Sequence, residues 1–121
     1  MKHLLLTALL TIIAYSASAG KQDSIAVVIN NYNYVIYVGD SLQLGYGANP
    51  DGSFMYIYSG IDIPLEKSNA GKKVIIKAIR YIKATDEIKI TLRGKGIYHL
   101  AYVPHAMEKG EIVSINGFGF D

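Results

Sequence analysis

Residues 72–93, KKVIIKAIRYIKATDEIKITLR, decide the fold of this chain. Over residues 87–93 apolar and polar residues alternate strictly, which is the period of a half-buried strand. Residues 72–83 fit either one face of a helix or a strand, but their five β-branched residues pack better on a pleated surface. The three residues between the two segments match a hairpin connection. We therefore predict a long β-hairpin. A helix over residues 72–83 is the alternative, and it would make the fold α+β.

Outward from this hairpin, short apolar runs separated by turn signals predict further strands. These expected strands are residues 24–29, 34–38, 42–46, 53–59, 97–103 and 111–115. The strongest turn is Asn-Pro-Asp-Gly at residues 49–52. Residues 60–71 are expected to form a long loop with room for a brief strand at 61–63.

Many short strands with little helix predict an all-β fold, either a small SH3-like open barrel or a compact β-sandwich. One short helical turn is expected near residues 104–109. Pro104 suits its first position, and Gly110 suits a left-handed cap at its end.

Residues 1–19 are typical of a cleavable secretory signal peptide. Lys2 precedes an apolar run of about 11 residues, shorter than the ~20 that span a bilayer. Ala17-Ser18-Ala19 then matches the small-residue pattern of a cleavage site. We expect cleavage near Ala19-Gly20, leaving residues 20–121 as one β-rich domain. An uncut membrane anchor is the alternative, while a lipid anchor is excluded because the chain has no cysteine.

The absence of cysteine also rules out disulfides, which fits a periplasmic or secreted bacterial protein better than a small exported domain of a higher organism. Without Lys2 the remaining chain carries 11 Lys and Arg residues against 10 Asp and Glu residues. This balance argues against nucleic-acid binding, which usually needs a clear cationic excess. After signal cleavage no stable membrane anchor is expected.

Two stretches resemble small, largely uncharacterised exported proteins of Bacteroidetes-type bacteria. The first is residues 39–45, GDSLQLG, continuing through Asp-Gly-Ser-Phe at 51–54 to residues 56–57. The second is the aromatic strand from Tyr98, which leads through Ala106 to Gly-Glu-Ile at 110–112. The resemblance implies export and a small β-fold, and it implies no activity.

No arrangement of residues predicts catalysis. A nucleophilic triad needs an activated Ser or Cys, and no serine stands in a G-x-S-x-G elbow. His99 is expected to be a partly buried, hydrogen-bonded strand residue, and His105 to flank the helical turn and face water. With Glu108 these histidines are the only local candidates for a metal site, and a third convergent ligand is missing. Asp51 is better explained as a turn former than as a calcium ligand. We predict no catalytic residues, no metal and no cofactor.

Tyrosine is the one residue type in excess, with ten in the chain and no tryptophan. Tyr56 and Tyr58 are expected to share one strand face, as are Tyr98 and Tyr102. Tyrosine offers rigid contact area with a polar tip, which suits recognition surfaces, although it is also a favoured strand residue. We predict a non-enzymatic exported module that binds a protein or a cell-envelope polymer through these four tyrosines. The alternatives are a small hydrolase that uses His99 or His105, and a structural protein that assembles through strand edges.

Overall fold

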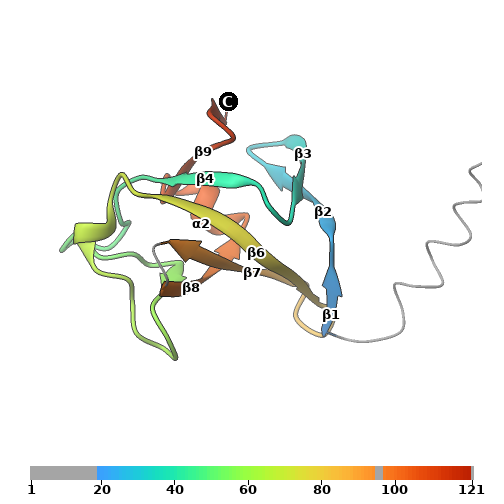
Figure 1. Ribbon diagram of the computed structural model, residues 1–121, viewed down its shortest axis with the longest axis horizontal. Coiled ribbons are helices and arrows are strands. Elements are labelled where there is room, and N and C mark those ends of the chain that lie inside the picture. Colours follow the sequence, from blue (N-terminus) through green and yellow to red (C-terminus); the bar gives the residue numbers. More distant parts are fainter. Residues whose placement is uncertain (1–18, 95–96, 121) are drawn as a thin grey trace, which may run out of the picture.

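The computed structural model describes residues 19–94 and 97–120, and most of these residues lie in strands (Figure 1). The elements follow in the order β1 (Ala19–Gln22), β2 (Ser24–Ile29), β3 (Tyr32–Tyr37), β4 (Ser41–Leu44), β5 (Ile57–Tyr58), η1 (Lys67–Asn69), β6 (Lys73–Ile82), β7 (Glu87–Gly94), β8 (Ile97–Val103), α2 (His105–Glu108), β9 (Ile112–Ile115) and β10 (Phe118–Gly119). The all-β prediction is confirmed, and α2 is the expected helical turn. Of the predicted signal peptide, residues 1–18 lie outside the described residues.

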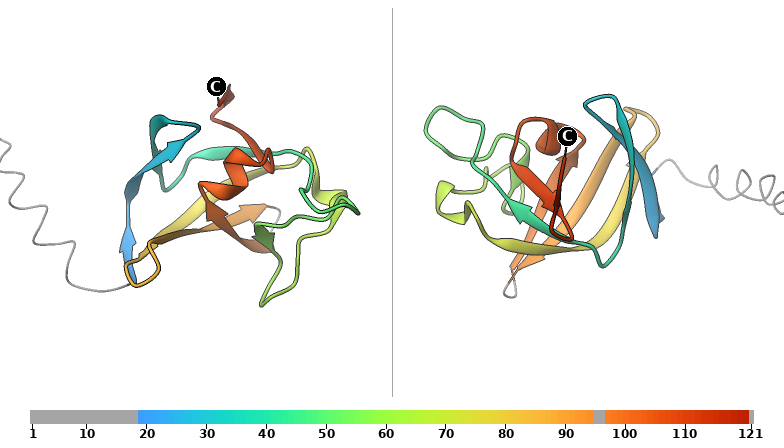
Figure 2. Two further views of the ribbon diagram at one scale, coloured as in Figure 1. Left: turned by 180° about the vertical axis from the view of Figure 1, so that it is seen from behind. Right: turned by 90° about the horizontal axis from the view of Figure 1, so that it is seen from above.

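All strand pairs in the described segments are antiparallel. Eight strands form one sheet in the order β10–β9–β4–β6–β7–β8–β5, with β1 also paired to β6, while β2 and β3 form a separate two-stranded sheet. In this order β10 and β5 are the two ends, so the large sheet stays open and does not close into a barrel. Figure 2 shows the β2–β3 hairpin standing to one side of the curved main sheet.

The hairpin of β6 and β7 is the centre of the sheet, as residues 72–93 predicted. Ile79 lies opposite Ile90, and both side chains are fully buried. A register shift between Ile76 and Ala78 allows Ile76 and Ile79 to point into the core although they are three positions apart. This bulge explains why residues 72–83 also fitted a helical face: their buried positions are spaced by two and then by three.

One apolar core joins the main sheet, the β2–β3 hairpin, residues 54–65 and α2. Its buried members are Val27, Ile29, Ile36, Leu42, Leu44, Phe54, Ile57, Leu65, Val74, Ile76, Ile79, Ile90, Leu92, Ala101, Val103, Ala106, Met107 and Ile112. Strand β8 shows the expected alternation, since His99, Ala101 and Val103 are buried whereas Tyr98 is exposed. None of the helices in the described part of the chain has the length and apolar character needed to cross a membrane.

The strand expected over residues 53–59 is wrong for most of its length, because only Ile57 and Tyr58 pair as a strand. Phe54 and Ile57 are both fully buried, which a regular alternation of faces would not allow. The brief strand expected at 61–63 is also not formed. Ile61 is 88% exposed there, and the only bridge of this loop among the described residues joins Tyr58 to Pro64.

Candidate functional site

A cleft of about 640 Å³ opens where β5 and the loop after it meet β7, β8 and the start of α2. Aromatic, aliphatic and charged side chains share its lining. The lining residues are Met55, Tyr56, Tyr58, Gly60, Ile61, Asp62, Glu87, Lys89, Leu100, Tyr102 and His105. A concave site with apolar walls and a few polar groups is the common form of a ligand-binding site. We call this site the tyrosine cleft.

Two ring pairs build the wall of the tyrosine cleft. Tyr58 meets Tyr102 edge to face, with ring centroids 5.9 Å apart, and Tyr56 lies 5.3 Å from the ring of His105. Backbone pairing sets these positions, since β5 pairs with β8 and the Tyr102 N–H donates to the carbonyl of Tyr56 at 2.9 Å. Three tyrosines from two strands and the segment before β5 therefore converge on one site.

Charged groups of both signs line the tyrosine cleft. Lys89 lies opposite Tyr102 in the β7–β8 pair, and its Nζ is 5.2 Å from the centroid of that ring, a cation–π distance. Glu87 lies two residues before Lys89, and Asp62 lies on the loop that follows β5. The lining thus offers flat apolar rings together with hydrogen-bonding and charged groups.

The fourth predicted tyrosine, Tyr98, does not belong to this site. It lies on the same face of β8 as Tyr102 but four residues earlier, and it does not line the cleft. Its ring is 53% exposed and packs near Arg93, whose guanidinium carbon is 5.7 Å from the ring centroid. The structure therefore brings together three of the four predicted residues.

Glu111 holds the wall of the cleft in place, a role that the sequence analysis did not predict. The residue is fully buried, just beyond α2. Its Oε2 accepts the backbone N–H groups of Ala48 at 2.7 Å and Met55 at 2.6 Å, and its Oε1 accepts that of Tyr56 at 2.8 Å. A carboxylate that accepts three N–H groups is well satisfied despite its burial. These bonds also explain the short β5, because the N–H groups of Met55 and Tyr56 bind a side chain instead of a neighbouring strand.

Two glycines allow the backbone segments around Glu111 to lie close enough together for its carboxylate to accept these N–H groups. A Cβ on Gly45 would lie 2.2 Å from the carbonyl oxygen of Gly110, and a Cβ on Gly47 would lie 2.2 Å from that of Ser53. No larger residue fits either place without a shift of the backbone. The two stretches that carry the sequence resemblance thus meet here, around one buried carboxylate.

The turn at residues 49–52 is structural, as expected. The Gly52 N–H donates to the Asn49 carbonyl at 2.8 Å, and Gly52 has a φ of +90°. Asp51 accepts both the hydroxyl and the backbone N–H of Ser53, and these bonds lower the pKa of Asp51. Asp51 therefore acts as a turn former.

The two histidines lie in different places. His105 lines the tyrosine cleft and is exposed, as predicted. His99 is 8% exposed and lines another cavity. Its Nδ1 has no hydrogen-bond partner among the described residues, so the expected hydrogen-bonded histidine is wrong in that respect. Within residues 19–94 and 97–120, no group of three or more His, Asp or Glu side chains is placed to hold a metal ion.

No protein-family model, no curated protein and no solved structure matches this chain. Its function is therefore inferred from the geometry of the site.

Proposed function

We propose that this chain is a non-enzymatic, exported binding module of the bacterial cell envelope, which engages a protein or an envelope polymer through the tyrosine cleft. The observation that carries the proposal is the convergence of Tyr56, Tyr58 and Tyr102 on one open cleft of about 640 Å³. Tyrosine rings present apolar faces for stacking and hydroxyl groups for hydrogen bonds. Polymers with alternating apolar and polar surfaces, such as glycans and peptides, match this lining.

Binding is favoured over hydrolysis by the composition of the lining. His105 is the histidine of the cleft, and the described lining contains no serine or threonine for it to activate. Its ring instead packs against Tyr56, where it extends the aromatic wall.

The test of binding uses peptidoglycan fragments released by a muramidase, which carry sugar and peptide together. The fragments are titrated into residues 20–121 while backbone amide shifts are followed by NMR. Tyr102→Ala should weaken binding about tenfold, a typical loss for a central aromatic contact. Tyr98→Ala is the matched control, because it removes a tyrosine from the same strand face outside the cleft.

Ile61→Ser is a second variant, and it leaves the packing of the core unchanged because Ile61 lines the cleft and is 88% exposed. It should also weaken binding while leaving the unfolding curve unchanged. Equal affinities for the Tyr102→Ala and Tyr98→Ala variants would contradict the proposed site. The proposed site would also be contradicted if the fragments shifted backbone amide signals only outside residues 55–62.

Export is proposed from residues 1–19 and from the resemblance to exported bacterial proteins. The whole chain should be expressed in a Gram-negative host and the periplasmic fraction examined by intact-mass spectrometry. The expected product begins at Gly20. A product that retains residues 1–19 would contradict a cleaved signal.

A structural or assembly role is the second candidate, and the β2–β3 hairpin favours it. The outward face of this hairpin carries Val28, Val35 and Tyr37, each at least half exposed. Strands with such faces can pair or pack with another copy. Light scattering over a concentration series tests this role, with Val35→Lys as the variant that should abolish any association.

A further inference from the structure

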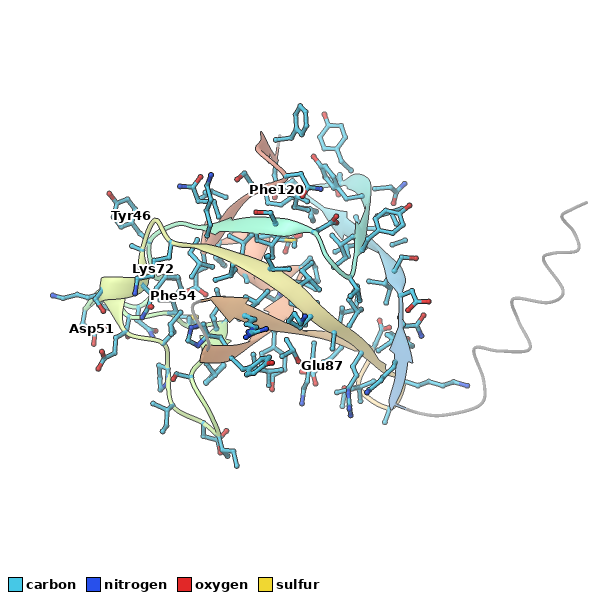
Figure 3. All side chains as sticks on the ribbon, in the orientation of Figure 1. Tyr46, Asp51, Phe54, Lys72, Glu87 and Phe120 are labelled. Atoms are coloured by element: carbon cyan, nitrogen blue, oxygen red, sulfur yellow. The ribbon has the colours of Figure 1, made fainter. Side chains whose placement is uncertain are left out.

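A second cavity, of about 430 Å³, lies apart from the tyrosine cleft. It is lined by Leu44, Asn69, Lys72, Lys73, Val74, Gly94 and His99, none of which lines the cleft. Figure 3 shows Lys72 at the end of the molecule that also carries Asp51, away from Glu87, which lines the cleft. The two cavities are therefore separate sites.

The inner part of this cavity combines apolar side chains with a buried imidazole. Leu44 and Val74 are core residues, and His99 points to the same side of β8 as the buried Ala101. His99 lies opposite Leu92 in the sheet and is 8% exposed. Its Nδ1 is buried, and no residue that the structure describes offers it a hydrogen bond, which is a costly state for a polar atom. A ligand that bonded to this ring would relieve that cost.

The outer part of the cavity is cationic. Lys72 and Lys73 both line it, and the Lys72 ammonium donates to the Asn69 Oδ1 at 3.1 Å. None of the lining residues in the described part of the chain is acidic. Burial lowers the pKa of His99, and the positive charge of Lys72 lowers it further. An anion placed between the two groups would face a positive charge on one side and an imidazole N–H on the other.

We propose that this cavity binds a small organic carboxylate, with its oxygens between the Lys72 ammonium and the His99 imidazole and its apolar body against Leu44 and Val74. Nδ1 is buried in this structure, so binding requires the imidazole ring to rotate about χ2 until Nδ1 faces the ligand. The χ2 torsion of histidine is soft enough to allow this rotation. The volume suits a ligand of modest size. The site is independent of the proposed function of the tyrosine cleft.

The test uses octanoate as the probe and octanamide as its uncharged counterpart. Each is titrated into residues 20–121 while the imidazole signals of His99 are followed by NMR. Octanoate should shift these signals in a saturable way and raise the pKa of His99, because a bound carboxylate favours the imidazolium. Octanamide should bind about fivefold more weakly.

Two substitutions test the assigned contacts. Lys72→Gln should weaken octanoate binding about two- to fivefold, the usual range for an exposed ion pair. Lys83→Gln is the matched control, since Lys83 follows the other end of the ten-residue strand β6. His99→Leu should weaken binding about tenfold and remain folded, because it removes a polar atom that has no partner.

The proposal is overturned if octanoate leaves the His99 signals unchanged, or if octanamide binds equally well. Equal effects of Lys72→Gln and Lys83→Gln would overturn it as well. So would shifts confined to the tyrosine cleft, which would place the carboxylate in the other site.

Discussion

The Glu111 carboxylate accepts the backbone N–H of Tyr56 at 2.8 Å, across 55 residues of sequence. This bond anchors the backbone of a cleft tyrosine to a residue that does not itself line the cleft. The other carboxylate oxygen accepts the N–H groups of Ala48 and Met55. One buried side chain thus positions the whole segment that leads into β5.

Glu111→Gln should lower the free energy of unfolding by about 2–4 kcal/mol. The amide keeps the size of the side chain but replaces one acceptor oxygen with an NH₂ group, so at least one of the three backbone N–H groups loses its partner. Urea unfolding measures the loss. Glu108→Gln is the control, since Glu108 is exposed on α2, and its effect should stay below about 1 kcal/mol. Equal effects would show that Glu111 does not hold the segment.

Gly45→Ala and Gly47→Ala should each destabilise the protein by about 1–3 kcal/mol or more, because the new Cβ would meet a backbone carbonyl at 2.2 Å. Thermal unfolding followed by circular dichroism measures the effect. Gly119→Ala provides the comparison, since its Cβ would meet its nearest neighbour at an ordinary 3.6 Å. A Gly45→Ala variant as stable as Gly119→Ala would mean that the close approach to Gly110 is not required.

Tyr56→Ser and Tyr98→Ser should differ in stability. Tyr56 packs against the core and against His105, so its loss should cost about 2 kcal/mol. Tyr98 is half exposed, and its loss should cost less than about 1 kcal/mol. Chemical denaturation of both variants checks this difference. If both variants unfold at the wild-type midpoint, Tyr56 makes no contribution to the core.

His99 should make the protein less stable as the pH falls. Burial, with a smaller effect of Lys72, lowers its pKa in the folded state below the ordinary value of 6.5. The unfolded state therefore binds a proton first, so stability is full above about pH 6.5 and declines as the pH drops toward the folded pKa.

Urea unfolding between pH 7.5 and 5.5 measures this dependence. His99→Leu should flatten the dependence and be at least as stable as the wild type at pH 7.5, since Nδ1 has no partner to lose. The same slope in the variant and the wild type would assign the pH dependence to other groups.

The local sequence pattern predicted strands correctly where they pair with strands that are close in sequence. The alternation in residues 87–93 predicted β7, and the runs at 24–29 and 97–103 match β2 and β8. Hairpin partners are close in sequence, so the side-chain period and the turn residues largely determine them. The ambiguity over residues 72–83 came from a bulge, which breaks the period of two.

The side-chain period of the strands also predicted part of the candidate site. The sequence predicts Tyr56, Tyr58 and Tyr102 as aromatic residues on strand faces, and all three line one cleft. Tyr98 shares the face of Tyr102, but the cleft does not extend that far along β8. Two residues on one strand face point in the same direction. Their position in the strand does not determine which residues of other strands lie beside them.

The sequence by itself determined the strand content, the central hairpin, the helical turn before Gly110 and the tyrosines available for a site. Only the tertiary structure decided that residues 53–56 leave the sheet and that Glu111 is the partner of the Met55 and Tyr56 N–H groups. A glutamate in sequence looks like a solvent-exposed charge, because nothing local shows that three distant N–H groups will surround it. Its burial is possible because Gly45 lies close to Gly110 and because the carboxylate accepts the N–H groups of Ala48, Met55 and Tyr56.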